Sequence, residues 1–440
     1  MAGEWETALL GELYDFSSGL SKPREEFGFG HGFLSFKDVF YNYFAPEKLE
    51  QLVNSTEKEQ QSCSIQRGDV FLTRTSETMD ELGMSCVALK SYERATFNGF
   101  TKRLRPKGAV QIVPEYAGYY FRSPSFRCEV TAMSSLSTRA SLNNEMLGRL
   151  KMVLPPVTTQ EAIGSILKAL DDKVELNRRM NATLEAMARA LFQSWFVDFD
   201  PVRAKLDGRK PIGLDEPTAA LFPDSFQESS LGHIPKGWDV CPLSEKIQLL
   251  SGGTPKTSEP TYWNGDIPWY SVRDAPSETD VWVIHTDKHV TKLGIANSAA
   301  QVFPEKTTII SARGTVGKLA LTAVPMAMNQ SCYGVRGING YGDYFTYYSL
   351  REATAQLQQR THGTVFDTIT TETFKTLDCI FPTPKITAAF DKLVEPLLGQ
   401  IRANLHQSRT LATLRDTLLP KLLSGELSVA GIESRLEAVT

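Results

Sequence analysis

The chain carries the same helical pattern of apolar positions twice. Apolar residues recur at steps of three and four between residues 163 and 195, and again between 390 and 422. This spacing places one apolar stripe along one face of a helix. A helix of about 36 residues would be roughly 54 Å long. Because so long a helix with a single apolar seam needs a partner, we expect the two copies to pack as an antiparallel coiled coil.

The two stripes stand at a constant offset of 227 residues. The first comprises Ile163, Ile166, Leu170, Val174, Asn177, Leu184, Met187 and Leu191, and the second comprises Phe390, Leu393, Leu397, Ile401, Asn404, Leu411, Leu414 and Leu418. A polar residue inside an apolar seam fixes register at some cost in stability. Asn177 and Asn404 either do this or lie at the solvent edge of the stripe, and the pattern leaves both interpretations equally open. Pro396 is expected to kink the second helix or mark its start, and Pro420 to end or bend it.

Shorter matches extend the repeat beyond the helices. Trp5–Glu12 aligns with Trp238–Glu245. Gly68–Arg74 matches Lys306–Arg313 less cleanly, with a shift of about one residue. The chain is therefore expected to be an internal duplication, in which a globular module and a long helix each occur twice.

Both modules show short β-type runs between Gly- and Pro-marked loops, such as 70–73 and 307–310, with fewer helical stretches. The expected fold class is α+β, with two mixed modules joined by two long antiparallel helices in a pseudo-twofold repeat. The connector between the repeats carries five prolines, and we expect it to be irregular but ordered, anchored by Phe199 and Phe222. The expected segments are the first module 1–157, the first long helix 158–197, the connector 198–236, the second module 237–384, the second long helix 385–425 and a C-terminal tail 426–440.

Composition is that of an ordinary globular protein. The 440 residues are 41% hydrophobic and 22% charged, which suits two or three domains. The first six residues include two acids and no apolar core, so no secretory signal is expected. No apolar run approaches the ~18 residues of a membrane span. The six cysteines are scattered without a Cys-x-x-Cys pair, which favours reduced thiols in a cytoplasmic protein.

The net charge of -4 hides an uneven distribution. Residues 90–139 hold nine Lys or Arg against three Glu, whereas residues 1–89 hold seven basic and fifteen acidic residues. A locally basic surface is what contact with phosphates requires. A solvated protein face explains the same charges equally well.

The motifs of catalysis fail on inspection. Gly314–Lys318 resembles a phosphate loop, but its glycines are too close together and Leu319 follows the lysine. His285 and His289 stand four apart, yet in a strand-like run rather than on a helix. The glycine-rich residues 27–32 are expected to form a surface loop. We therefore expect no catalytic, cofactor-binding or metal-binding residue in this chain.

The remaining chemistry is that of binding. Arg, Asn and Gln can hydrogen-bond base edges in a bidentate way, while Lys and Arg neutralise phosphates. The candidate DNA-binding residues are Arg74, Lys102, Arg103, Arg105 and Arg122 in the first module, and Lys256, Trp269, Tyr270, Arg273, Arg313, Asn329, Gln330 and Arg336 in the second.

Five segments stand out in the sequence: residues 231–238, 250–256 and 262–269 in and before the second module, 192–202 at the end of the first long helix, and 418–427 at the end of the second. Together they resemble a known family, the specificity subunits of type I restriction-modification enzymes. The first three are similar to hallmarks of its target recognition domains, and the last two resemble its central and distal conserved regions. The first module lacks the Gly-Gly-Thr-Pro and Tyr-Trp-Asn-Gly hallmarks of the second. Recognition domains vary with their target, so this difference bears on individual residues more than on the fold.

The resemblance implies that each module is a target recognition domain that reads one half of a bipartite site in the major groove of double-stranded DNA. It also implies that the helices separate these domains and dock two modification subunits. Those subunits would use S-adenosylmethionine to methylate adenine, and restriction or motor subunits would use ATP and Mg²⁺. The chain itself would bind no cofactor and catalyse no reaction. Two other functions stay open: an orphan or inhibitory specificity chain, and a coiled-coil scaffold that binds protein.

Overall fold

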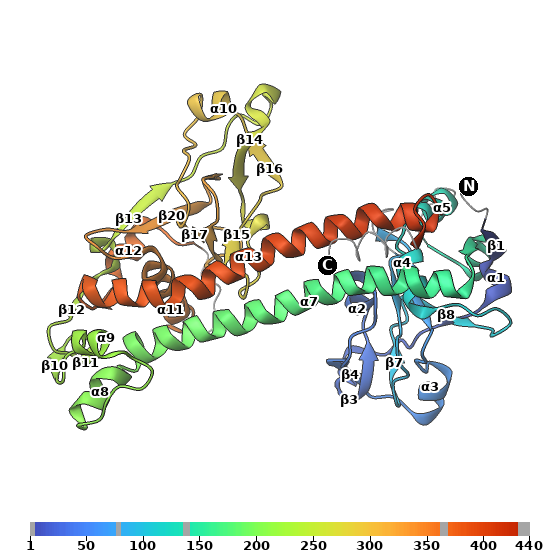
Figure 1. Cartoon of the computed structure of the whole chain (residues 1–440), viewed down its shortest axis with the longest axis horizontal. Helices are drawn as coiled ribbons and strands as arrows, with labels where there is room; N and C mark the ends of the chain where they lie inside the picture. Colours follow the sequence, from blue (N-terminus) through green and yellow to red (C-terminus); the bar gives the residue numbers. More distant parts are fainter. Residues whose placement is uncertain (1–4, 76–80, 135–140, 361–367, 430–440) are drawn as a thin grey trace. The chain divides into compact units, whose positions relative to one another are not determined.

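The computed structural model describes residues 5–75, 81–134, 141–360 and 368–429. They form two compact units: the first unit comprises residues 1–173 and 410–440, and the second unit comprises residues 174–409. Both units include part of two long helices, α7 (Val157–Phe192) and α13 (Pro384–Leu423) (Figure 1). The division between the units therefore runs through the helices rather than at their ends.

A four-stranded antiparallel sheet in the order β2-β8-β5-β6 forms the centre of the first unit. Because successive side chains of a strand point to opposite faces, β5 contributes to two cores. Val70 and Leu72 pack with two helices that follow the sheet in sequence, and Phe71 packs in the other core. The strands are β2 (Tyr14–Ser18), β5 (Val70–Thr73), β6 (Ser85–Val87) and β8 (Thr101–Pro106), and the helices are α4 (Pro114–Tyr120) and α5 (Pro124–Ser134).

The other core of the first unit lies against a smaller sheet, β4 (Gln51–Val53), β3 (Phe27–Leu34) and β7 (Thr96–Phe97). Strand β3 has a β-bulge, within which Gly28 and Gly30 adopt φ angles of 97° and 96°. Only glycine adopts this backbone region without strain. The glycine-rich residues expected to form a surface loop are thus a bulged strand.

Short elements complete the first unit. Strand β1 (Glu6–Leu9) pairs antiparallel with β9 (Lys151–Leu154), which brings the beginning of the first module beside its end. The remaining elements are α1 (Leu10–Leu13), the 3-10 turn η1 (Arg24–Glu26), α2 (Phe36–Tyr41), α3 (Glu57–Ser62) and α6 (Asn144–Arg149).

The second unit repeats this plan with one additional strand. Its main sheet has the order β13-β20-β17-β18-β15, and its smaller sheet has the order β16-β14-β19. The bulge of β3 recurs in β14 between Trp263 and Ile267, and β12 pairs with β21 as β1 pairs with β9. The internal duplication predicted from sequence is therefore confirmed in the topology.

The bounds of the second unit's elements follow the chain. Its strands are β12 (Asp239–Pro242), β13 (Ile247–Ser251), β14 (Trp263–Tyr270), β15 (Trp282–Val283), β16 (Lys288–Val290), β17 (Thr308–Ser311), β18 (Leu319–Thr322), β19 (Ala327–Met328), β20 (Cys332–Gly337) and β21 (Asp378–Phe381). Its shorter helical elements are η4 (Leu243–Glu245), η5 (Pro260–Tyr262), η6 (Val272–Asp274), α10 (Lys292–Ala296), α11 (Asp343–Arg360) and α12 (Thr371–Thr376).

Strand register resolves the uncertain match between the modules. Val70 pairs with Leu104 in the first unit, and Thr308 pairs with Val335 in the second, so β5 corresponds to β17 and β8 to β20. The equivalent of Arg74 is then Ala312, since their carbonyl oxygens accept matching hydrogen bonds from the N–H groups of Leu142 and Ile369. Arg313 lies one residue further along and corresponds to Thr75.

The long helices pair antiparallel within each unit, as expected. In the second unit, Asn177 contacts Asn404 while Phe192 packs against Phe390, so partners run in opposite directions along the chain. In the first unit, Asp171 of α7 contacts Arg415 of α13. Helix α13 begins at Pro384, so Pro396 does not mark its start, and the helix ends three residues after Pro420. One turn of π-helix, Gln193–Val197, follows α7.

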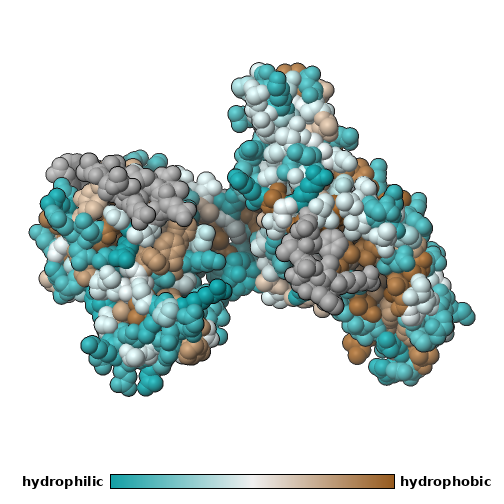
Figure 2. Space-filling model, turned by 180° about the vertical axis from the view of Figure 1, so that it is seen from behind, coloured by the Kyte–Doolittle hydropathy of each residue, from teal (hydrophilic) through white to brown (hydrophobic). Residues whose placement is uncertain are grey.

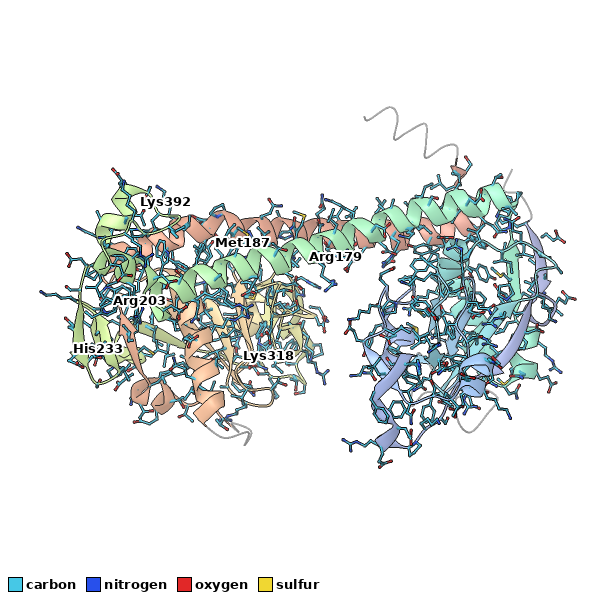
Figure 3. All side chains as sticks on the ribbon, turned by 90° about the horizontal axis from the view of Figure 1, so that it is seen from below. Arg179, Met187, Arg203, His233, Lys318 and Lys392 are labelled. Atoms are coloured by element: carbon cyan, nitrogen blue, oxygen red, sulfur yellow. The ribbon has the colours of Figure 1, made fainter. Side chains whose placement is uncertain are left out.

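The expected apolar seam is correct for part of its length only. Of its members, Met187, Leu393 and Leu414 are 50%, 40% and 44% exposed, and Met187 lies on the outer side of α7 (Figure 3). Each helix packs against a globular module as well as against its partner, which shifts the buried face toward positions such as Ala188 and Val394. Ile163, Asn177, Phe390, Ile401 and Asn404 are buried, whereas Ile166, Leu170, Val174, Leu184, Leu191, Leu397, Leu411 and Leu418 are partly buried.

The two asparagines lie inside the interface rather than at its solvent edge. Asn177 and Asn404 are 0% and 3% exposed. Asn177 Nδ2 donates to Gln407 Oε1 at 2.9 Å, and Asn404 Nδ2 donates to Asn181 Oδ1 at 2.9 Å. We call Asn177, Asn181, Asn404 and Gln407 the polar layer. Because these partners meet in one register only, the polar layer fixes how the helices align.

The connector is more regular than expected. It forms α8 (Asp200–Leu206), α9 (Glu216–Leu221) and a hairpin of β10 (Phe226–Ser229) and β11 (Gly232–Pro235). The predicted anchors Phe199 and Phe222 are buried in the core of the second unit, which confirms that the segment is ordered by apolar contacts.

Candidate nucleic-acid interface

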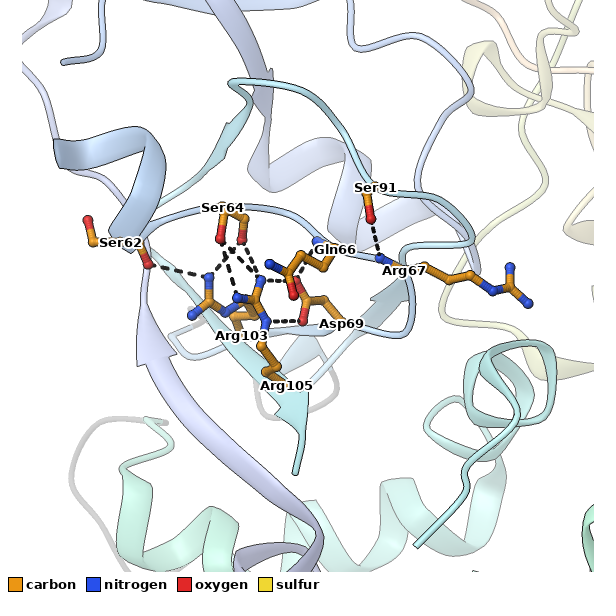
Figure 4. A network of polar contacts seen from close by, with 8 residues as sticks. All are labelled: Ser62, Ser64, Gln66, Arg67, Asp69, Ser91, Arg103 and Arg105. Atoms are coloured by element: carbon orange, nitrogen blue, oxygen red, sulfur yellow. Dashed lines mark hydrogen bonds and ion pairs between the residues drawn. The ribbon is translucent and has the colours of Figure 1, made fainter. Parts of the chain in front are cut away.

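Two of the candidate arginines in the first unit hold a loop in place. The Arg103 guanidinium donates to the carbonyl oxygens of Ser62 at 3.3 Å and Ser64 at 2.7 Å (Figure 4). Arg105 forms an ion pair with the buried carboxylate of Asp69 at 2.6 Å. A buried carboxylate needs such a partner. Asp69 thus engages the Arg105 guanidinium, and backbone carbonyl oxygens engage that of Arg103, so both groups are held inside the unit.

Arg122 likewise forms internal hydrogen bonds. Its guanidinium donates to the carbonyl oxygens of Ser85 at 2.7 Å, Val39 at 2.9 Å and Phe40 at 2.8 Å. It also lies over the ring of Tyr43, 4.9 Å from the centroid. The structure thus assigns Arg122 to the joining of α2 with the main sheet.

Arg74 and Lys102 differ from these three arginines. In the described part of the chain, their side chains neither pair with a carboxylate nor donate to a backbone carbonyl oxygen. The Arg74 Nε is buried, and no described residue accepts a hydrogen bond from it. Lys102 Nζ donates to Ser18 Oγ at 3.0 Å. Burial and the positive charge of Arg74 lower the pKa of the Lys102 ammonium group below its usual value.

The aromatic candidates of the second unit belong to its core. Trp269 is 6% exposed and its Nε1 donates to the Gly253 carbonyl oxygen at 2.9 Å, while Tyr270 is fully buried. Burial raises the pKa of the Tyr270 hydroxyl above its usual value. Both rings are therefore packed inside the second unit and do not lie on its surface.

Three further candidates of the second unit are engaged by neighbours. Arg336 pairs with Asp343 at 3.1 Å. The Asn329 side chain accepts a hydrogen bond from the Ser331 N–H at 3.1 Å, which shapes the turn before β20. Gln330 accepts a hydrogen bond from the Thr254 hydroxyl.

Five candidates remain as open cations, by which we mean charged side chains with neither an ion pair to a described carboxylate nor a hydrogen bond to a described backbone carbonyl oxygen. They are Arg74, Lys102, Lys256, Arg273 and Arg313. Arg74 follows β5 and Arg313 follows the equivalent strand β17, so both lie at the same edge of corresponding sheets. Lys102 lies at the start of β8, which in an antiparallel sheet is that edge too.

Polar anchors that the sequence pattern does not reveal join the modules to the helices. In the first unit, Asp171 accepts hydrogen bonds from the Tyr119 hydroxyl at 2.7 Å and from Arg415 Nη1 at 2.5 Å. The Arg415 guanidinium also lies over the Tyr43 ring, and the Arg122 guanidinium contacts the same ring. By helical periodicity, Asp171 falls on the solvent-facing side of its helix. Its partners Tyr119 and Arg415 lie 52 and 244 residues away in the sequence, so periodicity within the helix does not reveal these contacts.

Different residues anchor the second unit. Arg351 of α11 pairs with the Glu185 carboxylate of α7 at 2.5 Å, and the Glu185 side chain is only 3% exposed. The Trp282 Nε1 donates to the Leu398 carbonyl oxygen at 2.8 Å. Burial, partly offset by Arg351, raises the pKa of Glu185 above its usual value.

Asp391 of α13 caps helix α11. It accepts hydrogen bonds from the N–H groups of Tyr344 at 3.2 Å and Phe345 at 2.7 Å. Burial nevertheless raises the pKa of Asp391 to about 7, although these two bonds favour the charged form. The group therefore holds a proton more tightly in the folded chain than in the unfolded one.

This shift predicts a pH-dependent stability. A folded-state pKa of about 7, against the ordinary 3.8, means that stability is lost as pH rises between these two values. Asp391→Asn is expected to make the thermal unfolding midpoint less dependent on pH between about pH 4 and pH 8. Asp172→Asn, a change at an exposed carboxylate of α7, is the control and should leave the slope as it is. An unchanged slope in Asp391→Asn would refute the assignment.

The described residues contain no group of three or more His, Cys, Asp or Glu side chains placed to hold a metal ion. None of their helices combines the length and apolar character needed to cross a membrane. Hydrophilic and neutral residues cover most of the face drawn in Figure 2.

Comparison with known proteins identifies the family. The family described as Type I restriction modification DNA specificity domain matches residues 3–186 and 235–405, which together span most of the chain and both repeats. The chain belongs to this family. The resemblance inferred from the hallmark segments is thereby confirmed.

Relatives in this specificity family span the chain. The HindI specificity subunit of Haemophilus influenzae is 28% identical over 340 residues, covering 68% of this chain and 74% of its own. The MjaIX specificity subunit of Methanocaldococcus jannaschii is 26% identical over 428 residues, covering 96% of this chain and 92% of its own. The crystal structure of the S subunit from M. genitalium matches with a TM-score of 0.53 at 15% identity, over 95% of this chain and 96% of that one, which shows the shared fold.

Proposed function

We propose that this chain reads a bipartite sequence in double-stranded DNA on behalf of a type I restriction-modification complex. Each unit would contact one half-site. The observation that carries the proposal is the placement of the open cations, with Arg74 and Arg313 at the same edge of equivalent sheets. Cations without a protein partner are available to phosphates and base edges. Two such edges in one duplicated chain suit two half-sites of different sequence.

The chain would determine the DNA sequence that the complex recognises, and its partner subunits would carry out catalysis. Two modification subunits would bring S-adenosylmethionine and methylate adenine, and restriction or motor subunits would use ATP and Mg²⁺. We infer that these partners dock along the helices, where Met187 on α7 and Leu393 and Leu414 on α13 leave apolar surface exposed.

Methylome sequencing tests the proposed function. The chain is expressed with its modification subunit in a host without DNA methylation. A single new bipartite adenine motif, absent when this chain is omitted, is the expected result. No new methylation from a confirmed soluble complex would favour an inhibitory specificity chain or a protein-binding scaffold.

Arg313 provides a test of half-site assignment. Arg313→Ala is expected to relax discrimination in the half-site read by the second unit by about tenfold at one or two base pairs, as loss of one base contact does. The other half-site should be unaffected. The readout is the frequency of methylation at variant sites.

Lys375→Ala is the matched control for Arg313→Ala, because Lys375 lies in the same unit and is already paired with Glu372 at 3.3 Å. It should leave both half-sites unchanged. Equal relaxation of both half-sites in Arg313→Ala would show that this residue does not read one half-site.

A further inference from the structure

A hollow of about 360 Å³ opens in the first unit between the end of β5 and the start of β8. The segment before α6 forms its third wall. Its lining residues are Arg74, Thr75, Lys102, Ser141, Leu142, Asn143 and Asn144. We call it the Arg74–Lys102 hollow.

The backbone holds both cations of this hollow in place. The Arg74 N–H donates to the Phe100 carbonyl oxygen at 3.0 Å, and the Arg74 carbonyl oxygen accepts from the Leu142 N–H at 2.9 Å. Lys102 pairs in register with Ser18 on one side and Leu72 on the other. The backbones of Arg74 and Lys102 therefore stay close together as long as the ladder of the main sheet is intact.

No described carboxylate of the lining compensates the charge of the hollow. Its described lining contains two cations and no carboxylate. The Arg74 Nε is buried without a described acceptor. The Arg103 Nε is as well, but the Arg103 guanidinium donates through Nη1 to backbone carbonyl oxygens, and Arg105 pairs with Asp69. Two like charges held together and partly withdrawn from water cost free energy unless an anion joins them.

The lining selects for an anion with several oxygens. Besides the guanidinium and ammonium groups, the walls offer the hydroxyls of Thr75 and Ser141 and the amide of Asn144. Charged N–H donors form their strongest hydrogen bonds to carboxylate or phosphate oxygens. The anion that double-stranded DNA presents is the backbone phosphate.

The equivalent place in the second unit lacks this chemistry. Strand register puts Ala312 at the position of Arg74 and Tyr333 at the position of Lys102. The second unit therefore cannot form the same pair of cations. A phosphate-binding site at this place would therefore occur in the first unit only.

We propose that the Arg74–Lys102 hollow binds a phosphate of the DNA backbone beside the half-site that the first unit contacts. This inference rests on the DNA-reading function proposed above and adds a sequence-independent contact to it. Such a contact positions the protein on the duplex and does not choose between bases.

The test is the salt dependence of DNA binding. The complex of this chain with its modification subunits is titrated onto a fluorescent duplex carrying the methylome-derived target, at several KCl concentrations. The double variant Arg74→Gln, Lys102→Gln is expected to lower the slope of log affinity against log salt by about one, the value for one phosphate contact. The ratio of affinities for target and non-target duplexes should stay unchanged.

Matched variants separate loss of charge from loss of fold. Arg149→Gln removes an exposed charge of α6 that Glu145 already compensates at 2.6 Å, and it should leave the slope unaltered. The charge-preserving double variant Arg74→Lys, Lys102→Arg should keep the slope of the wild type. Thermal unfolding of each variant shows that the first unit is intact.

Two results would overturn the inference while the proposed function stands. One is an unchanged salt slope in the Gln double variant. The other is a loss of discrimination at particular base pairs, which would make the hollow a base-reading site. If the wild-type complex bound no DNA at any salt concentration, the proposed function itself would fall, and the hollow with it.

Discussion

Inserting four residues into both long helices is expected to lengthen the spacer between the two half-sites. The insertions follow Lys173 in α7 and Arg409 in α13, at the two points where the chain passes from one unit to the other. There they interrupt neither the contact of Asp171 with Arg415 nor the polar layer. Four helical residues add about 6 Å, which corresponds to one or two base pairs at ~3.4 Å each.

The readout of the insertion is the methylated motif. We expect the original motif to lose methylation and a motif with the same half-site bases but a longer spacer to replace it. Substituting four residues at the same places without changing length is the control and should preserve the original motif. An unchanged spacer after insertion in both helices would rule out the helices as the determinant of spacing.

Arg351→Met is expected to destabilise the second unit strongly. The Glu185 side chain is 3% exposed and pairs with Arg351 at 2.5 Å. Removing one partner of a buried ion pair costs about 3–5 kcal/mol, because the other charge is left without compensation. Urea unfolding of the whole chain, followed by tryptophan fluorescence, measures the loss.

The sign of the pH effect gives this prediction a second readout. Burial already raises the pKa of Glu185, and Arg351 opposes that shift, so losing Arg351 raises the pKa further. The folded variant then binds the proton more tightly, and its stability falls as pH rises through the new pKa. The double variant Glu185→Gln, Arg351→Met should regain most of the stability and lose the pH dependence. Equal destabilisation of both variants would contradict the explanation.

Local periodicity explains why the long helices could be predicted. The steps of three and four that mark Ile163 or Phe390 depend only on the helix itself, and α7 and α13 have nearly the expected bounds. The exposure of Met187, Leu393 and Leu414 could not be predicted in this way. It depends on which side of each helix a module covers, and that is decided by contacts distant in sequence.

The candidate site shows the same limit more clearly. An arginine that binds a phosphate and one that braces a loop carry the same chemistry, so Arg74 and Arg105 were indistinguishable in the sequence. Arg105 is internal because β8 places it beside Asp69, which lies 36 residues away. Trp269 and Tyr270 looked like binding aromatics, but the parallel pairing of β14 with β19 buries them. Only tertiary pairing separates these cases.

The discontinuity of the first unit has a consequence for biosynthesis. The second unit is continuous and is fully synthesised once residue 409 has emerged from the ribosome, whereas the core of the first unit includes Leu419, Leu422 and Leu423. Domains usually complete folding in the order of their synthesis. Here the order is reversed for the last step, because part of the core of the first unit stays uncovered until Leu423 has been synthesised. A nascent chain stalled just after residue 409 should therefore carry a folded second unit and an incomplete first unit that chaperones can still bind.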